Sequence, residues 1–322
     1  MKILFVTNMY PTKSHPTDGI FVKEQIEDLT RAINCEHDLY YINAKRKGKW
    51  NYLLSIFGIP LKILSKKYDI IHVHYGISAL FLLFFKPRSP VYLTLHGSDI
   101  IERADNSWQV SITKKILRKV DKVFLQNREM AEIVGKINKN FEIIPCGVNT
   151  DFFKPVVRRN EKDENLKIIV FPNSPSRGVK NFPLFQKVIQ HLTESSTYRI
   201  EFKCVDNLSR AEVRDLFNTA DCLLMTSLSE GSPQVIKEAL SCGLPIVSVP
   251  VGDVKLMAAG VPHCYVSQTR SPEELSRLVQ LSFAKNGDGH AIRNAFISKG
   301  NYDHVSITKR LAENYDSHLL TN

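Results

Sequence analysis

The feature that most constrains the fold is a repeated alternation of short β-branched strand candidates with longer amphipathic segments. In the first half of the chain the expected strands are residues 2–7, 38–42, 70–74, 91–95, 122–126 and 142–144. Segments such as 21–33 and 111–120 lie between them and have the apolar spacing of helices. Val- and Ile-rich strands that alternate with helices are typical of a parallel sheet covered on both faces.

The second half of the chain repeats this alternation. Its expected strands are residues 166–171, 198–204, 221–225 and 246–249. Its expected helices are residues 182–194, 209–218, 234–242 and 272–284. A chain of 322 residues exceeds what one hydrophobic core usually fills. We therefore predict an α/β protein with two Rossmann-like, doubly wound parallel-sheet domains.

A polar, charged stretch that begins at Pro155 separates the two halves and reads as a linker. The expected parts are an N-terminal domain (1–154), the linker (155–165) and a C-terminal domain (166–300). Residues 301–322 are expected to form a helix that packs back on the N-terminal domain. Ligands of such sheets bind beyond the carboxyl ends of the strands, so we expect a site in a cleft between the domains.

The most informative segment is SLSEGSPQVIKEALSCGLPIV, residues 227–247. A loop after the strand 221–225 leads into a helix that is expected to stop at Gly243. The loop brings Glu230 and the amides of Gly231 and Ser232 to a helix N-terminus, which favours phosphate and other anions. Glu238 lies one turn into this helix, where its carboxylate could accept hydrogen bonds from the vicinal hydroxyls of a ribose.

Here the sequence resembles the retaining glycosyltransferases of family four, also called glycosyl transferases group 1, which have the GT-B fold. The resemblance rests on Glu230 and Glu238, separated by seven residues, followed by Ala239 and by Gly-Leu-Pro at 243–245. It implies that Glu238 holds the ribose of a nucleotide and that Glu230 contacts the donor sugar. The donor-binding residues that it implies in this segment are Gly231, Ser232, Pro233, Gln234 and Glu238.

The resemblance continues in the first half, at residues 69–74, 95–99 and 144–153. It implies that His96 contacts the donor sugar, whereas His72 and His74 read more simply as buried histidines at a strand end. The loop after the first strand usually carries a pair of glycines in this family. This chain has Asp18 before Gly19, so only Gly19 carries over as a donor-binding residue.

The charge of a diphosphate calls for cations, and the loop after strand 166–171 contains Arg177 and Lys180. The resemblance implies that both neutralise the leaving phosphates and that Asn173 adds a neutral donor. The residues implied in catalysis are therefore His96, Glu230, Lys180 and Arg177. No D-x-D motif occurs, so we predict no metal site and no cofactor besides the sugar nucleotide.

The reaction implied is transfer from a UDP- or GDP-sugar, with retention at the anomeric carbon, to a saccharide or lipid-linked acceptor. The overall pattern resembles bacterial enzymes that make capsule, exopolysaccharide or teichuronic-type polymers. A sugar-nucleotide epimerase of related fold and a non-catalytic sugar-nucleotide-binding subunit are the alternatives. A dinucleotide oxidoreductase is disfavoured because no G-x-G-x-x-G motif occurs.

The net charge of +10 is concentrated in the N-terminal half, where residues 1–155 contain 23 Lys and Arg against 15 Asp and Glu. The run KRKGKW at 45–50 leads into an apolar segment that starts with Leu53 and Leu54. This suits an anionic membrane surface, with Trp50 and Tyr52 as interfacial anchors. It equally suits a solvated basic loop before a core-facing helix. No nucleic-acid-binding module accompanies the charge, so nucleic acid is not an expected partner.

Six scattered cysteines without a C-x-x-C pair indicate reduced thiols rather than a disulfide framework. The first residues read as a strand and not as a signal peptide. The longest apolar stretch is about half of the roughly 20 residues that a transmembrane helix needs. We therefore expect a cytoplasmic protein, at most peripheral on the inner face of the plasma membrane.

Overall fold

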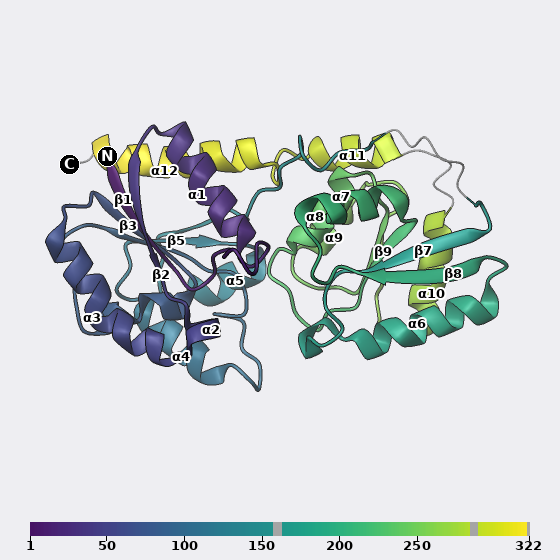
Figure 1. Cartoon of the computed structure of the whole chain (residues 1–322), viewed down its shortest axis with the longest axis horizontal. Helices are drawn as coiled ribbons and strands as arrows, with labels where there is room; N and C mark the ends of the chain where they lie inside the picture. Colours follow the sequence, from purple (N-terminus) through teal and green to yellow (C-terminus); the bar gives the residue numbers. More distant parts are fainter. Residues whose placement is uncertain (157–162, 284–288, 321–322) are drawn as a thin grey trace. The chain divides into compact units, whose positions relative to one another are not determined.

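The computed structural model describes residues 1–156, 163–283 and 289–320. Contacts divide the chain into two compact units (Figure 1). Unit 1 comprises residues 1–147 and 304–322, and unit 2 comprises residues 148–303. Residues 157–162 of the predicted linker lie outside the described residues.

Unit 1 is built on a six-stranded sheet with the order β2-β1-β3-β4-β5-β6, and every neighbouring pair is parallel. The strands are β1 (Lys2–Thr7), β2 (Glu36–Tyr41), β3 (Ile70–His74), β4 (Val91–Thr94), β5 (Lys122–Leu125) and β6 (Phe141–Ile143). β2 is added on one side of β1, whereas β3 and the strands that follow it are added on the other side. Such a reversal creates room for ligands at the carboxyl ends of the strands.

Alternate residues of each strand enter different hydrophobic cores because successive side chains of a strand point to opposite faces. Ile3 and Phe5 pack with α1 (Ile20–Ala32) and with α12 (His304–Leu320), which lies against α1. Leu4 and Val6 enter the core on the other face. The helices around that second core are α2 (Ala44–Lys47), α3 (Trp50–Ser65), η1 (Gly76–Leu83), α4 (Ser107–Ile116) and α5 (Arg128–Val134).

Unit 2 contains a five-stranded parallel sheet with the order β11-β10-β9-β7-β8. The strands are β7 (Leu166–Phe171), β8 (Arg199–Cys204), β9 (Cys222–Met225), β10 (Ile246–Ser248) and β11 (Tyr265–Val266). The helices are η2 (Gly178–Lys180), α6 (Phe182–Ser195), α7 (Arg210–Thr219), α8 (Gln234–Ser241), α9 (Val254–Ala258), α10 (Pro272–Ser282) and α11 (Gly289–Ile297). The direction of the chain across the sheet reverses between the neighbours β7 and β9.

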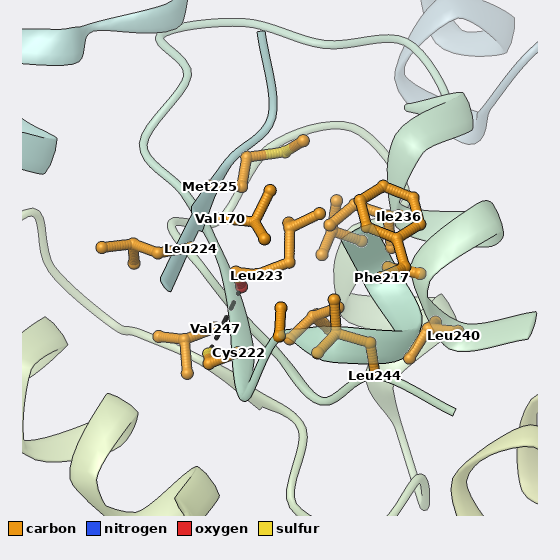
Figure 2. Close-up of a cluster of buried hydrophobic side chains, with 14 of the residues drawn as sticks. Val170, Phe217, Cys222, Leu223, Leu224, Met225, Ile236, Leu240, Leu244 and Val247 are labelled. Carbon is orange, nitrogen blue, oxygen red and sulfur yellow. Dashed lines mark hydrogen bonds between the residues drawn. The ribbon is translucent and has the colours of Figure 1, made fainter. Parts of the chain in front are cut away.

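The core of unit 2 fixes the strand whose carboxyl end leads to the glutamate segment. In Figure 2, Leu223 of β9 points toward Phe217 of α7 and Ile236 of α8, while Leu224 points to the opposite side. Both leucines are fully buried. Leu223 therefore packs β9 against α7 and α8. This packing holds α8 in place at the end of the loop that joins it to β9.

The predicted doubly wound α/β class is confirmed in both units. The predicted strands 2–7, 70–74 and 166–171 coincide with β1, β3 and β7, and the other predicted strands differ at their ends by one or two residues. The short elements η1 and β11 were not predicted. The part of the predicted helix 272–284 beyond residue 283 lies outside the described residues.

Among the helices in the described part of the chain, none has both the length and the apolar character needed to cross a bilayer. All six cysteines are free thiols.

Candidate active site

Two loops of unit 2, one after β7 and one after β9, lie side by side because their strands are neighbours in the sheet. The backbone N–H of Leu228 donates to the carbonyl of Val179 at 2.8 Å. The hydroxyl of Thr226 donates to the carbonyls of Lys180 and Asn181 at 3.1 and 3.0 Å. These bonds hold the loop with the predicted cations against the loop with the predicted glutamates.

Lys180 and Glu230 meet across these two loops, with 2.6 Å between Nζ and Oε1. Their side chains are only 10% and 12% exposed. An ammonium and a carboxylate that are both nearly buried require each other, because either one left alone would lose its hydration without compensation. The structure thus brings together two of the residues that the sequence singles out.

Arg177 and Asn173 lie on the same loop as Lys180 but nearer to solvent. The Arg177 side chain is exposed, and its Nη1 lies 3.4 Å from Oδ1 of Asn173. Oδ1 of Asn173 also accepts from the N–H of Ser174 at 2.9 Å. Arg177 can therefore change its rotamer at little cost, in contrast to the fixed ammonium of Lys180.

The remaining predicted donor-binding residues form the entry to α8. Pro233 occupies the N-cap position without a side-chain cap, and Gln234 is the first helical residue. The hydroxyl of Ser232 donates to Oδ2 of Asp253 at 2.8 Å. The positive end of the helix dipole lies at this entry, which therefore favours an anionic ligand group.

The loop at Gly231 is supported from behind by Gly252, which has a φ of 53°. A Cβ atom at Gly252 would lie 2.2 Å from the carbonyl oxygen of Gly231 and 3.0 Å from that of Glu230. Both the left-handed backbone conformation and this close approach require glycine. The position of the glutamate loop therefore depends on a residue that the motif does not contain.

Glu238 pairs with Arg210, a residue that the sequence did not single out. The carboxylate is 7% exposed and accepts from Nη1 of Arg210, which stands at the start of α7. The guanidinium lies over the ring of Phe153, with its Cζ 4.5 Å from the centroid. Arg210 is thus held on two sides and fixes one oxygen of Glu238.

A second polar group that the sequence did not single out lies beneath the glutamate segment. Lys237, between the two glutamates, has a fully buried side chain whose Nζ is 5.6 Å from the ring centroid of Tyr302. Burial raises the pKa of Asp253, while Lys237 acts in the opposite direction. Burial and the neighbouring Asp253 raise the pKa of Tyr302. The sequence signal for this group is the apolar spacing of α8, which places Lys237 on the buried side of the helix.

In unit 1, His96 follows β4 at the carboxyl edge of the sheet. Its Nδ1 is 4.0 Å from Sγ of Cys146, and its ring packs on Phe21 with 5.4 Å between centroids. Burial lowers the pKa of His96 to about 3, so the ring is neutral. Its buried Nε2 has no hydrogen-bond partner among the described residues.

His96 stands at the end of a row of stacked imidazoles. The His74 centroid is 5.6 Å from that of His96 and 4.4 Å from that of His72. His72 is bonded through Nε2 to Oγ1 of Thr94 at 2.7 Å and through Nδ1 to the hydroxyl of Tyr315. Burial lowers the pKa of His72 to about 3, and it lowers the pKa of His74 as well. The placement of His72 and His74 agrees with the interpretation of both as buried core histidines.

Asp99, three residues after His96, holds the loop that carries the histidine. Its carboxylate accepts from the N–H groups of His96 at 3.0 Å, Gly97 at 2.9 Å and Gly76 at 3.1 Å. Complete burial raises the pKa of Asp99 to about 6. The sequence placed Asp99 in a motif without a role, because only the folded chain shows that three amides converge on it.

Gly19, the N-cap residue of α1, has a φ of 65°. A Cβ there would lie 2.5 Å from the carbonyl carbon of Met9 and 2.7 Å from the N of Tyr10. Two residues further, Phe21 contacts the His96 ring. The loop after β1 and the loop after β4 therefore meet at one edge of the sheet of unit 1.

Within residues 1–156, 163–283 and 289–320, no group of three His, Cys, Asp or Glu side chains is arranged to hold a metal ion. The two units thus carry different chemistry. Unit 2 offers cations, carboxylates and a helix entry, which suit a phosphorylated ligand with hydroxyl groups. Unit 1 offers a neutral imidazole beside a glycine-containing loop.

Family models match both parts of the chain. The model of Glycosyltransferase Family 4 matches residues 20–152, and that of glycosyl transferases group 1 matches residues 152–281. Together they span both the His96 loop and the glutamate segment. TuaC of Bacillus subtilis, a glycosyltransferase assigned to teichuronic acid biosynthesis, is 21% identical across 87% of this chain and 88% of its own.

Solved structures resemble the whole chain at 14% identity. Sucrose-phosphate synthase from Thermosynechococcus elongatus gives a TM-score of 0.77 and covers 100% of this chain and 99% of its own. HepE from Anabaena, in complex with UDP, gives 0.73 and covers 98% and 100%. Likeness at this identity establishes the fold, which is GT-B. The family matches and this fold agree with each other, and the chain belongs to the glycosyltransferases of family 4 and group 1.

Proposed function

We propose that this glycosyltransferase moves a sugar from a UDP- or GDP-sugar to a saccharide or lipid-linked acceptor, with retention at the anomeric carbon. The observation that carries the proposal is the nearly buried pair of Lys180 and Glu230, held 2.6 Å apart on adjoining loops. Its cation suits a leaving phosphate and its carboxylate suits sugar hydroxyls. A transferase that binds a phosphorylated sugar needs both at one place.

The nucleotide half of the proposal rests on Glu238 and on the entry to α8. Glu238 is oriented by Arg210, and its carboxylate would accept hydrogen bonds from the hydroxyls of a ribose. The amides near Gly231 and Ser232 would receive phosphate oxygens, with Pro233, Gln234 and Asn173 beside them. The similar structures of HepE are complexes with UDP and with UDP-glucose, which supports a donor of this class.

In the proposed reaction, the bond between the anomeric carbon and the phosphate oxygen breaks while the acceptor oxygen bonds to the same face of that carbon. The proton of the acceptor hydroxyl passes to the departing phosphate, so no separate base is needed. Lys180 and Arg177 stabilise the charge that develops on the nucleoside diphosphate. His96 and Gly19 would contribute a neutral imidazole and a close backbone approach to the donor. No metal and no further cofactor take part in this proposal.

The acceptor side of the proposal rests on TuaC and on the surface of unit 1. TuaC carries the name of a teichuronic acid biosynthesis enzyme, which supports a role in cell-surface polysaccharide synthesis such as that of capsule. The basic N-terminal half fits an enzyme that works on the cytoplasmic side of the plasma membrane, where lipid-linked intermediates are made.

Thermal unfolding with UDP, GDP, ADP and their sugars tests the donor class. We expect UDP or GDP, and the matching sugar nucleotide, to raise the melting temperature of the wild type. Glu238→Ala should reduce that shift, because the ribose contact is lost. Absence of any shift with all these nucleotides would contradict the proposal.

The products formed from the donor that stabilises the protein test the reaction itself. We expect an α-linked sugar on the acceptor from an α-linked donor, as read from the anomeric proton by NMR. A changed sugar still joined to its nucleotide would indicate an epimerase, and a β-linked product would indicate inversion.

A further inference from the structure

Helix α3 (Trp50–Ser65) exposes a continuous apolar stripe on the surface of unit 1. The stripe consists of Trp50, Leu53, Leu54, Phe57, Leu61 and Leu64. Their exposed fractions run from 47% at Leu53 to 75% at Trp50. Positions 50, 54, 57, 61 and 64 follow the spacing of one helical face. Large apolar side chains that gather in this way mark an interaction surface, whereas scattered ones do not.

The opposite face of α3 is already fixed to unit 1. Ser55 and Ile59 are buried, and a Cβ at Gly58 would lie 2.3 Å from the hydroxyl of Tyr40 on β2. Tyr52 accepts a hydrogen bond from Asn8 at 2.7 Å. The helix therefore cannot turn its stripe inward without breaking these contacts. Tyr52 points inward and is not the interfacial anchor that the sequence suggested, whereas Trp50 is 75% exposed.

All charged residues in the segment that contains the stripe are basic. Residues 39–68 contain seven Lys and Arg and no Asp or Glu. Lys47 and Lys49 are exposed just before the helix, and Lys66 and Lys67 are exposed just after it. Two of the lysines in this segment form ion pairs with aspartates outside residues 39–68. Lys66 pairs with Asp38 and Lys45 with Asp18, each at 3.0 Å. Lysines thus border both ends of the apolar stripe.

We propose that the α3 stripe docks on an anionic lipid surface, with the six apolar side chains in the interface and the flanking lysines at the headgroups. Trp prefers the boundary between headgroups and acyl chains, and basic residues are attracted to anionic lipids. A second copy of this chain would bring two sets of like charges together, so it fits the stripe less well. The use of this contact in catalysis rests on the proposed function, but the contact itself does not.

Co-sedimentation of the full chain with vesicles tests the docking surface. We expect binding to phosphatidylcholine vesicles that contain phosphatidylglycerol, and weaker binding to phosphatidylcholine alone or at high salt. The variant with Leu54→Glu and Phe57→Glu should partition at least about tenfold more weakly, because two carboxylates would enter the interface. Lys47→Gln with Lys49→Gln should reduce the preference for anionic vesicles.

Leu256→Glu is the matched control, since Leu256 lies in unit 2 and is 62% exposed against 66% for Leu54. It should sediment with vesicles as the wild type does. Wild type that stays in solution with anionic vesicles would overturn the inference, and so would a double variant that binds like the wild type. If α3 is instead an interface between copies, Leu54→Glu will dissolve a dimer and no vesicle binding will occur. UDP-induced thermal stabilisation in the same variants reports on the proposed function separately, because it needs no lipid.

Discussion

Each of the two glutamates of the family motif has its own cation. Glu230 is paired with Lys180 and Glu238 with Arg210, and all four side chains are mostly buried. Breaking a pair of this kind usually costs more than the pair contributes, because the remaining charge is left without hydration. The motif therefore forms two ion pairs, and of the two cations only Lys180 was singled out from the sequence.

Lys180→Ala should lower kcat by about 100-fold, since a cation opposite the leaving phosphate would be lost. Lys180→Arg should restore part of the rate because it keeps the charge. Lys187→Ala, at an exposed position on α6, is the control and should leave kcat unchanged. Steady-state kinetics with the donor that stabilises the protein measures these rates. Near wild-type kcat in Lys180→Ala would refute the assigned role.

Arg210→Leu and Glu238→Gln should each weaken nucleotide binding by about tenfold, and the double variant should be little worse than either alone. The reason is that both changes remove the same oriented carboxylate. Arg214→Leu serves as control, because Arg214 lies on the same helix and over Phe152 at 5.1 Å, yet it pairs with Asp215. Calorimetric titration with UDP or GDP gives the dissociation constants. Additive losses would show that Arg210 does not act through Glu238.

The residues missed from the sequence share one physical property. Each of the four residues contacts a group that is distant along the chain: Arg210 contacts Glu238, Lys237 lies near Tyr302, Asp253 accepts from Ser232 and Asp99 accepts from Gly76. A lysine within a helix reads as solvated unless its neighbours are known, and Lys237 is fully buried. By contrast, Lys180 and Glu230 follow strands that the sequence predicted, and the structure shows that these strands are neighbours.

At the level of elements, the site of unit 2 depends on loops that follow β7, β8, β9 and β10 at one edge of the sheet. Of these strands, β7 and β10 contain runs of β-branched residues that predict a strand directly. The two-residue strand β11 and the helix η1 were not predicted, because neither has a sequence period of its own. In α3, apolar residues occur on every face, so the sequence alone could not separate a docking stripe from a core-facing side.

Gly252→Ala should displace the glutamate loop, since its Cβ would lie 2.2 Å from the carbonyl oxygen of Gly231. We expect nucleotide affinity to fall by about tenfold or more, in keeping with the sensitivity of sites to small displacements. Gly260→Ala is the matched control, with a φ of 70° and no atom within 4 Å of the added Cβ. It carries the same backbone strain without the contact. Equal nucleotide affinities in the two variants would show that Gly252 does not hold the glutamate loop in its binding position.

At the level of the whole molecule, the three stacked histidines make unit 1 sensitive to acid. Burial lowers the pKa of His72 and His96 to about 3 and lowers that of His74. An unfolded chain would protonate them near pH 6.5, whereas the folded chain would not. The unfolded state therefore binds more protons as pH falls, and stability decreases. The pKa of Asp99, raised to about 6, works in the opposite direction but offsets only one group.

The free energy of unfolding of unit 1 should fall by on the order of 2 kcal/mol per pH unit below about pH 6. Urea unfolding followed by tryptophan fluorescence measures this, because both tryptophans, Trp50 and Trp108, belong to unit 1. His74→Phe should reduce the slope, since it removes one neutral imidazole and keeps an aromatic ring. His37→Phe, at an exposed position, should not. If His74→Phe leaves the slope of unfolding free energy against pH unchanged, the stacked histidines are not its cause.

Helix α12 closes unit 1 although it follows all of unit 2 along the chain. Its Ile307, Leu311 and Tyr315 complete the core that contains Ile3 and Phe5. On the ribosome, this core therefore waits for the last helix, and only α1 of the two helices covers that face of the sheet while about half of the protein is still being made. Unit 2 has no such delay and can complete its core first. The order in which the two units mature is thus the reverse of the order in which they begin.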